Sequence, residues 1–564
     1  MSDKKKLQVV FCWHMHQPEY RDLQTGEYKL PWTYLHVIKD YVDMVAHLEA
    51  HPEAKAVVNF APILLEQIED YAKQINNYLH DRVAVSDPLL AALVAPAIPS
   101  DPDERLVIVK NCLRANRERL IDRYPPFRKL AEMVSWLEDN HIAMQYINSQ
   151  FIADILAWYH LAWMGETVKL TDPRVKRLIE KGCHYTLQER FEIIEIIGDI
   201  FSKLICRYRN LAKNGRIELS VTPYAHPIMP LMLDINSTHQ AMPDAPLPEL
   251  EAYPGGEERV KWHLMQGLAT FERFFGFKPR GCWPSEGSVS KQTLKLLSEF
   301  GFDWAASGGS VLHNSLRHSQ MEDEIIHQPF TVKDTQIAGF FRDDGLSDLV
   351  GFEYSTWHAE DAVADLVQHL QNIAEHESEA SVVSIILDGE NAWEHYPNNG
   401  FHFLNELYKN LSQHPDIELT TFSECLDSNA RVKELPDLIA GSWVYGTFST
   451  WIGDTDKNRG WDMLGEVKHC FDKVVASGRL SKKKLQIAEN QLAICEGSDW
   501  FWWFGDYNPG EAVSNFEKQF RLNLSNLYQL LGEEVPAYLS LTFTQGSGDP
   551  AMGGAMRPGA FDNA

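Results

Sequence analysis

Short apolar runs recur along the chain, and each is followed by polar, glycine or proline residues and then by helical periodicity. Strands of a parallel sheet are buried on both faces, so they show nearly continuous apolar runs of this kind. We therefore expect strands at residues 7–13, 56–61, 216–222, 279–283, 302–307 and 381–387. A further strand is expected within 325–341, and 417–422 is a candidate for another. The succession predicts an α/β fold in which βα units build a parallel sheet or barrel.

Two long stretches show helical periodicity instead. From about residue 88 to 210, apolar residues recur at three-to-four spacing, which predicts a helical insertion over one face of the barrel. After about residue 429 the pattern is helical again, with amphipathic segments at 464–476 and 482–495. The predicted parts are a barrel domain at 1–428, an α-helical domain at 429–540, and a loosely ordered Gly-, Pro- and Ala-rich tail at 541–564.

Charge and aromatic content narrow the class of partner. The chain has 52 Lys and Arg against 79 Asp and Glu, a formal charge of -27, so its average surface repels nucleic acid and anionic membranes. A neutral or cationic partner fits better. Sixteen Trp and 20 Tyr offer flat faces that suit the apolar faces of sugar rings, although large cores also collect aromatic residues.

The cysteines and the apolar runs bear on the compartment. Eight cysteines are scattered without a CxxC pair, which argues against a zinc knuckle or a disulfide scaffold. The first apolar run is only about seven residues long and is cut by His14, so we interpret it as a strand and not as a signal peptide. No run approaches the roughly 20 apolar residues of a membrane span. We therefore expect a protein of a reducing cytoplasm.

Two histidine-bearing segments lie where predicted strands end, which is where a parallel barrel presents its site-forming loops. His14 and His16 alternate, so both point to the same side and could donate hydrogen bonds or bind a metal. Tyr224 and His226 follow another strand and are flanked by prolines, which hold a ring in one orientation. A structural histidine pair and an ordinary proline-rich turn are the plainer interpretations of each segment alone.

Two acidic segments also follow predicted strands. Glu286 lies just past a strand, close to Trp283. A single glutamate at this position could serve only to interact favourably with the dipole of the following helix. Asp388, Glu390 and Glu394 follow the apolar run that ends at residue 387. Clustered, buried carboxylates raise one another's pKa, and a general acid must stay protonated near neutrality. A metal-binding or helix-capping loop is an equally open interpretation of this segment alone.

Together these segments resemble glycoside hydrolase family 57, the α-glucan-active enzymes of starch and glycogen metabolism. The resemblance rests on HMHQP at 14–18, GRIELSVTPYAHPIMPLM, GCWPSEG and LDGENAWEHYPNNG, in family order, and on GSDWFWWFGD at 497–506, which is similar to a segment of the α-amylase and amylopullulanase branch. Many relatives have a proline directly before the nucleophile, where this chain has Ser285.

The resemblance implies an incomplete (β/α)7 barrel followed by a helical domain that closes over the active site. It implies that Glu286 is the nucleophile and Asp388 the general acid/base of a retaining double displacement on α-1,4 glucosidic bonds, with no metal or other cofactor. The implied partner is an α-glucan polysaccharide or oligosaccharide. The residues expected to bind substrate are His14, His16, His226, Trp283, Trp393, Trp500 and Asp506.

Three alternatives to a hydrolase stay open at this point. A 4-α-glucanotransferase or branching enzyme would deliver the same covalent intermediate to a sugar hydroxyl, although the amylase-like segments favour hydrolysis. A metal-dependent polysaccharide deacetylase would use His14 and His16 as ligands and would not need Glu286. A catalytically silent glucan-binding protein would use the aromatic residues alone. The sequence leaves the α-1,6 capacity and the oligomeric state open.

Overall fold

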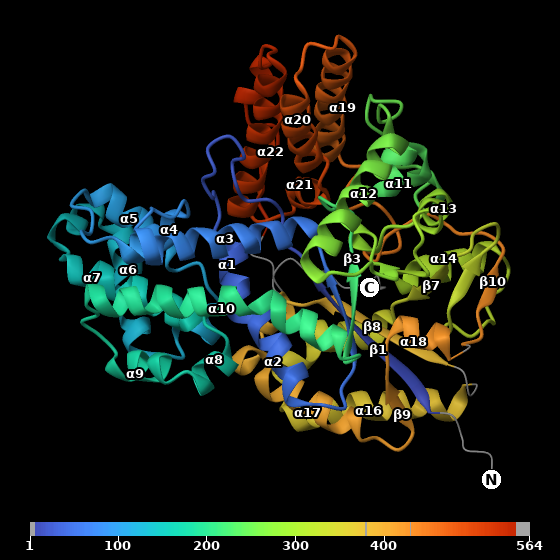
Figure 1. The fold of residues 1–564 in the computed structure, drawn as a ribbon, viewed down its shortest axis with the longest axis horizontal. Coiled ribbons are helices and arrows are strands. Elements are labelled where there is room, and N and C mark those ends of the chain that lie inside the picture. The colour runs from blue at the N-terminus through green and yellow to red at the C-terminus, as the bar shows by residue number, and fades with distance from the viewer. Residues whose placement is uncertain (1–5, 378–380, 429, 549–564) are drawn as a thin grey trace.

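The computed structural model describes residues 6–377, 381–428 and 430–548 of the 564-residue chain. Its strands form one sheet in the order β10-β6-β7-β5-β4-β3-β2-β1-β8, with β9 paired to β1 (Figure 1). The strands are β1 (Leu7–Met15), β2 (Ala56–Phe60), β3 (Ile217–Val221), β4 (Gly281–Cys282), β5 (Trp304–Ser307), β6 (Phe330–Val332), β7 (Ala338–Phe341), β8 (Val382–Asp388), β9 (Ile417–Leu419) and β10 (Lys433–Leu435).

Seven of the strands, β1 to β5 with β7 and β8, pair in parallel and curl into a barrel. The two ends of this series meet beside Arg342, just after β7, which bridges to Ser384 of β8 and donates from its guanidinium to the Ile386 carbonyl at 2.8 Å. There the Asp343 backbone N–H donates to the Ser384 carbonyl at 2.8 Å. The α/β class and the incomplete (β/α)7 barrel are therefore confirmed.

Burial explains why the apolar runs became strands. Every residue of β2 and β8 is buried, as expected for parallel strands covered on both faces. The sequence prediction differed at three places. Residues 325–341 hold two strands, β6 and β7, which pair antiparallel. β4 spans only two residues because Pro279 and Pro284 flank it and lack the N–H that a ladder needs. β10 has a short, half-polar sequence and was not predicted.

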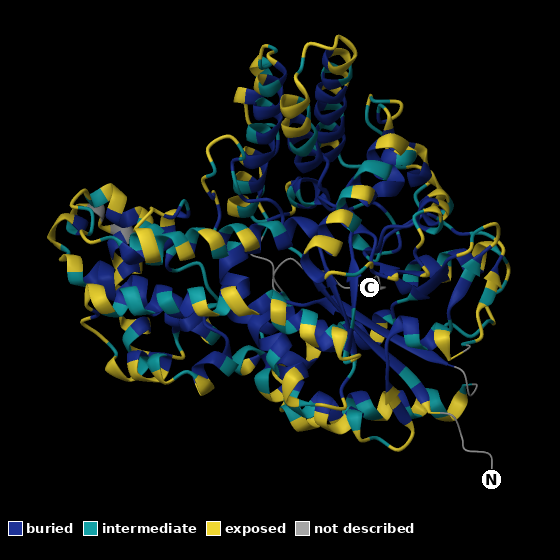
Figure 2. Cartoon of the chain, in the orientation of Figure 1, coloured by how far each residue is buried: buried dark blue, intermediate teal, exposed yellow. Residues whose placement is uncertain are grey.

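Helices between the strands cover the barrel. They are α1 (Trp32–His36), α2 (Val42–Ala50), α3 (Pro62–Asp81), α11 (Met229–Leu233), α12 (Gly256–Phe275), α13 (Lys291–Glu299), α14 (Gly309–His318), α15 (Asp344–Asp348), α16 (Ala359–His376), α17 (Phe401–Ser412) and α18 (Phe422–Asp427). Exposed residues gather on the outer faces of these helices, while the central strands of the sheet are buried (Figure 2).

The segment between β2 and β3 contains a series of helices, and Figure 1 shows most of them gathered on one side of the barrel. They are α4 (Pro88–Val94), α5 (Pro102–Asn111), α6 (Pro125–Asp139), α7 (Ser149–Trp163), α8 (Glu166–Thr171), α9 (Pro173–Lys181) and α10 (Leu187–Lys213). A capping box made by Thr186 and Glu189 starts α10. The helical character predicted for 88–210 is present, and we call the segment from α4 to α10 the insertion.

A second set of helices follows the barrel: α19 (Thr455–Ala476), α20 (Lys482–Cys495), α21 (Ser498–Trp503) and α22 (Gly510–Leu531). The division into domains at residue 428 stays a prediction, and the predicted tail lies outside the described residues from 549 onward. Across the described chain, each helix is either too short or too polar to cross a bilayer.

A fully buried ionic cluster ties this second set of helices to the barrel. The Glu496 carboxylate, between α20 and α21, accepts hydrogen bonds from Arg259 at 2.7 Å, His263 at 2.8 Å and Tyr253 at 2.6 Å. Burial alone would favour the neutral acid, yet Arg259 and His263 lower the pKa of Glu496 to about 2. The start of α21, which carries Ser498 and Asp499, is thereby held against α12.

Candidate active site

The carboxyl end of β1 lies between two strands whose last polar residues contact it. His14 is in register with Asn59 of β2 on one side and with Asp388 of β8 on the other. The His14 Nδ1–H donates to the Asn59 side-chain oxygen at 2.7 Å, which leaves Nε2 as an acceptor in the neutral ring. Burial, with a smaller effect of His16, lowers the pKa of His14 to about 3. His14 is therefore neutral near neutral pH.

His226 and Glu286 occupy loops after β3 and β4, and both have left-handed backbones, with φ of 60° and 57°. Such conformations are costly for residues other than glycine and concentrate at functional sites. His226 Nδ1 lies 3.7 Å from a Glu286 carboxylate oxygen. The Trp443 indole N–H donates to the other Glu286 oxygen at 2.9 Å. Glu286 is thus fixed between an imidazole and an indole.

The three histidines form a stack. Ring centroids lie 3.8 Å apart for His16 and His226, 5.2 Å for His14 and His226, and 5.6 Å for His14 and His16. His14 Nε2, His16 Nδ1 and His226 Nε2 are buried and have no hydrogen-bond partner among the described residues. Burial lowers the pKa of His226 well below its usual value. The stack therefore presents unpaired nitrogen atoms, and such buried groups need a partner.

One nitrogen from each ring lies within 4.8 Å of the others, which is close enough for the three nitrogens to be considered as ligands of one metal ion. A bound ion lies in the plane of each imidazole that coordinates it, because the nitrogen lone pair lies in that plane. The three rings are nearly parallel, with interplanar angles of 17°, 18° and 16°. Nearly parallel, stacked rings cannot all contain one ion in their planes. The geometry favours hydrogen bonding to a ligand.

Asp388, the last residue of β8, has the environment of a general acid. Burial raises the pKa of Asp388 to about 6, against the opposing effects of Asn391, His16 and Arg342. The Asn391 side-chain N–H donates to an Asp388 oxygen at 2.7 Å. A carboxylic acid with this pKa is partly protonated near neutrality, and it can donate a proton and later take one back.

Glu390 lies two residues beyond Asp388 and is 2% exposed. One of its oxygens accepts from the His16 backbone N–H at 3.4 Å, from Gln17 at 3.1 Å and from the Tyr41 hydroxyl at 3.1 Å. Burial, reinforced by Asp388, raises the pKa of Glu390 well above its usual value. Through these three hydrogen bonds, Glu390 organises the segment after β1.

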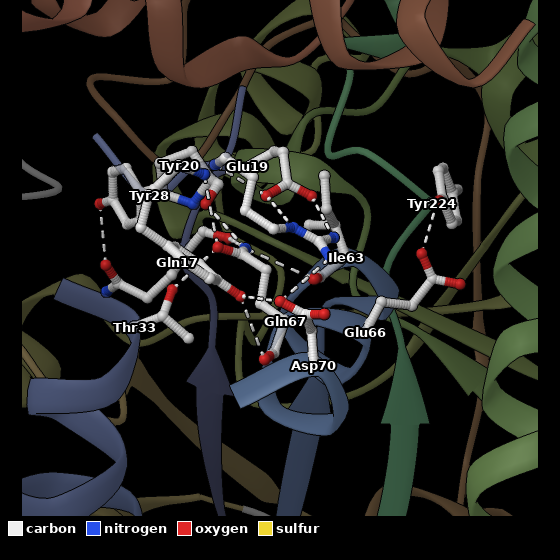
Figure 3. A network of polar contacts seen from close by, with 12 residues as sticks. Gln17, Glu19, Tyr20, Tyr28, Thr33, Ile63, Glu66, Gln67, Asp70 and Tyr224 are labelled. Carbon is white, nitrogen blue, oxygen red and sulfur yellow. Dashed lines mark hydrogen bonds and ion pairs between the residues drawn. The ribbon is translucent and has the colours of Figure 1, made fainter. Parts of the chain in front are cut away.

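A second network fixes that segment to α3, and Gln67 is its centre (Figure 3). The Gln67 amide donates to the Pro18 carbonyl at 2.8 Å, and its oxygen accepts from the Thr33 hydroxyl at 3.0 Å and the Tyr20 backbone N–H at 3.3 Å. The Tyr20 hydroxyl donates to Gln17 at 2.9 Å. His16 and its neighbours are therefore held rigidly, which is what a preorganised site requires.

The helices after the barrel complete the site. Asp499 of α21 accepts a hydrogen bond from His16 Nε2 at 2.8 Å. The Ser498 hydroxyl lies 2.8 Å from His226 Nδ1, and the Ser498 backbone N–H donates to the His226 carbonyl at 2.9 Å. Sequence reasoning missed Ser498, Asp499 and Trp443. Asp499 could have been found from the sequence, because this residue lies in the GSDWFWWFGD segment that resembles the family.

These residues surround a cavity of about 1010 Å³. It is lined by side chains from the barrel, from the insertion and from α21 and α22. The lining residues include His14, His16, Glu286, Asp388, Glu390, Asn391, Trp443 and Asp499, together with Trp32, Lys110, Arg114, Trp163, Trp503, Glu511, Asn515 and Phe516.

The predicted site residues divide into two groups. His14, His16, Glu286 and Asp388 line the cavity, and His226 contacts Glu286. Trp283 is fully buried behind them, 5.3 Å from the Trp443 ring. His226, Trp283 and the remaining three lie outside the cavity lining. Of these three, Trp393 packs on Trp13 in the core, Trp500 donates to the Ile494 carbonyl, and Asp506 is exposed. Direct substrate contact by these three has no support in the geometry.

Comparison with known proteins gives one family. The profile of glycosyl hydrolase family 57 matches residues 10–438. A 1,4-alpha-glucan branching enzyme of Thermococcus kodakarensis is 20% identical over 434 residues, which cover 63% of this chain and 60% of that protein. The match therefore spans less than two thirds of the relative's length.

Two solved structures have similar folds. A family 57 branching enzyme of Pyrococcus horikoshii has a TM-score of 0.56 and 16% identity, with 99% of this chain and 100% of that chain covered. An α-amylase of Thermotoga maritima has a TM-score of 0.53 and 13% identity, with 95% and 96% covered. At such identities the likeness shows the fold alone.

Proposed function

This chain belongs to glycosyl hydrolase family 57, and from that premise we propose that it is a retaining enzyme that cleaves α-1,4 glucosidic bonds of starch- or glycogen-type glucans. The observation that carries the proposal is the pair formed by Glu286, held by Trp443 and His226, and Asp388, whose pKa burial raises to about 6. Double displacement needs a carboxylate that acts as nucleophile and a second carboxyl group that can donate a proton and take it back.

In the proposed mechanism, a Glu286 oxygen attacks the anomeric carbon while Asp388 protonates the departing glycosidic oxygen. The bond to the leaving sugar breaks, and an ester between the glycosyl group and Glu286 forms. Asp388, now a carboxylate, then takes a proton from water as the water attacks the same carbon. Glu286 leaves as a carboxylate, and the anomeric configuration is retained overall.

The histidine stack supplies the positioning in this proposal. The unpaired nitrogens of His14, His16 and His226 are hydrogen-bond partners for the hydroxyl groups of the sugar being cleaved. Because His14 is neutral, its Nε2 accepts a hydrogen bond. A site built to pair with sugar hydroxyls rejects ligands that lack them, since its buried nitrogens would stay unpaired.

Transfer of the glycosyl group to a sugar hydroxyl is the second candidate. It uses the same intermediate, and the relative in Thermococcus kodakarensis is named a branching enzyme. The specific observation in its favour is the size of the cavity, which at about 1010 Å³ lies at the upper end of the range typical of ligand pockets. Room of this kind accommodates an acceptor chain. Product lengths from maltoheptaose separate the two candidates.

Azide rescue tests the role of each carboxylate. With an activated aryl α-maltoside, Glu286→Ala should be inactive in buffer, and added azide should form a β-glycosyl azide, because the ion replaces the missing nucleophile from the opposite face. Asp388→Ala should instead form the α-glycosyl azide, because the ester still forms and azide attacks it. Glu272→Ala, an exposed carboxylate on α12, is the matched control and should form no azide product. The reversed stereochemistry would overturn the assignment.

A further inference from the structure

Arg342, at the seam where the two ends of the barrel meet, is a buried charge that the double displacement does not use. It follows the last residue of β7, and its side chain lies outside the cavity lining. The guanidinium forms ion pairs with Asp344 at 3.1 Å and with Asp348 at 2.6 Å. A charge is costly to bury, so a buried arginine must be repaid by good contacts with its surroundings. Two of those contacts lead toward the catalytic carboxyl groups.

The first contact completes the edge of β8. This strand pairs with β1 along one edge, while its other edge faces the seam. Among the described residues, backbone pairing across the seam ends at Ser384. Side chains then take over, because the Ile386 carbonyl accepts from Arg342 Nε at 2.8 Å and the Ile386 N–H donates to the Ser347 hydroxyl at 3.2 Å. Buried backbone groups need partners, and these two fix the strand just before Asp388.

The second contact leads to the nucleophile. The guanidinium carbon of Arg342 lies over the Trp443 ring, 5.7 Å from its centroid, where the ring attracts a cation. Trp443 in turn holds Glu286 at two points. Its backbone N–H donates to the Glu286 carbonyl at 3.1 Å, and its indole N–H donates to a carboxylate oxygen at 2.9 Å. The guanidinium is therefore linked to Glu286 through a single aromatic residue.

The shape of the guanidinium explains why this position needs arginine. Arginine presents a flat fork of five N–H donors, so it can donate in its plane while its face contacts an aromatic ring. Here the donors reach β8, Asp344 and Asp348 while the group lies over Trp443. Asp344 is itself fixed, because it accepts from the Ser310 backbone N–H at 2.9 Å. A lysine ammonium carries the same charge on one nitrogen and cannot make all of these contacts together.

We propose that Arg342 is a positioning residue that couples the two carboxyl groups of the double displacement. It holds the Trp443 indole against Glu286, and together with Ser347 it fixes the end of β8 that carries Asp388. This inference rests on the proposed function and adds to it a residue outside the cavity. Loss of the fork should therefore slow formation of the ester while leaving the KM for substrate nearly unchanged.

Two donors separate the two contacts. Glu286 attacks both α-maltosyl fluoride and maltoheptaose, whereas protonation by Asp388 matters for maltoheptaose and little for the fluoride. The measurement is kcat/KM for each donor, which reports formation of the ester. Trp443→Phe removes the indole N–H and should slow both donors by a similar factor of about ten. Ser347→Ala should slow maltoheptaose about fivefold and the fluoride less than about twofold.

Arg342→Lys keeps the charge and removes the fork. It should slow the fluoride about tenfold and maltoheptaose by more. With the fluoride, the double variant Arg342→Lys/Trp443→Phe should be less than about twofold slower than the slower single variant, because both changes break the same linkage. Arg280→Lys is the matched control, since Arg280 also pairs with two carboxylates but is exposed and lies outside the cavity lining. It should change neither rate.

The ratio of the two rates separates positioning from a loss of folded protein. Partial unfolding lowers the amount of active enzyme and slows both donors by the same factor, so it leaves the ratio unchanged. An unchanged ratio in Ser347→Ala would overturn the proposal even if Arg342→Lys does not fold. Losses that multiply in the double variant, or wild-type rates in Arg342→Lys, would also overturn it. Wild-type protein that turns over neither donor would instead overturn the proposed function itself.

Discussion

Asn391 should control the pH at which the enzyme loses activity. Its side-chain N–H donates to an Asp388 oxygen at 2.7 Å and so stabilises the charged form of that carboxylate. Asp388 must be protonated when it acts as the general acid, and its pKa is about 6. Activity should therefore fall as pH rises through about 6. Asn391→Leu removes the donor, so the pKa of Asp388 should rise and this limb should move to higher pH.

The size of the shift follows from the hydrogen bond that is lost. A hydrogen bond to a charged group contributes about 1.5–3 kcal/mol, and the lower end applies here because Asn391 is only half-buried and water can replace part of it. About 1.4 kcal/mol corresponds to a pKa change of about 1. The kcat/KM ratio of variant to wild type should then rise by up to about tenfold between pH 5 and pH 8. Using the ratio removes any constant loss from altered substrate contact.

The assay measures kcat/KM as a function of pH for wild type and Asn391→Leu with one short maltooligosaccharide. Rates are measured at substrate concentrations well below KM, where the rate is proportional to kcat/KM. Asn405→Leu is the matched control, since Asn405 lies on α17 and pairs with His51, away from the cavity. Its ratio to wild type should be flat with pH. A flat or falling ratio for Asn391→Leu would refute the reasoning that this hydrogen bond sets the protonation of Asp388.

Three further predictions concern other parts of the site. Glu390→Gln should keep most activity, because the amide oxygen can still accept the hydrogen bonds from His16, Gln17 and Tyr41, whereas Glu390→Leu should lose stability and activity by leaving these donors unpaired. A severe kcat loss in Glu390→Gln, with folding intact by circular dichroism, would contradict this positioning role. Glu496→Gln should lower the free energy of unfolding, measured in urea, by about 3–5 kcal/mol, because the buried Arg259 loses its carboxylate partner. Glu69→Gln, which removes an exposed ion pair with Arg273, is the control and should cost less than about 1 kcal/mol. Similar costs for the two variants would contradict the stabilising role of the buried cluster. Turnover of maltoheptaose should survive exhaustive EDTA treatment, because the stacked rings of His14, His16 and His226 suit hydrogen bonding. Loss of turnover that returns with a divalent metal would show that the three rings hold a metal ion which the reaction needs.

The barrel end of the site could be predicted because it is local in sequence. His14, His16, Glu286 and Asp388 each follow an apolar run, and parallel strands bring their carboxyl ends to one edge. The parts contributed by distant segments could not be predicted that way. Trp443 reaches Glu286 from a stretch without helical or strand periodicity, and the Asp499 contact depends on how α21 is rotated against the barrel.

Within GSDWFWWFGD, the rotation of α21 decides which side chains can reach a ligand. Asp499 faces His16, whereas the next residue, Trp500, points back and donates to Ile494. Trp393 likewise fills the core beside Trp13, and its indole donates to the Gly389 carbonyl. Large aromatic residues next to catalytic motifs can serve packing as readily as binding, and sequence position alone does not separate the two.

The central claim is that Glu286 forms a covalent bond to the sugar, and trapping that ester tests it most directly. Incubation with a 5-fluoro-α-glucosyl or 5-fluoro-α-maltosyl fluoride slows breakdown of the intermediate, and peptide mapping by mass spectrometry then locates the added mass. We predict the label on the peptide that contains Glu286, with none in Glu286→Gln. A label on another residue, or turnover that gives the β-anomer first with no label at all, would contradict the account.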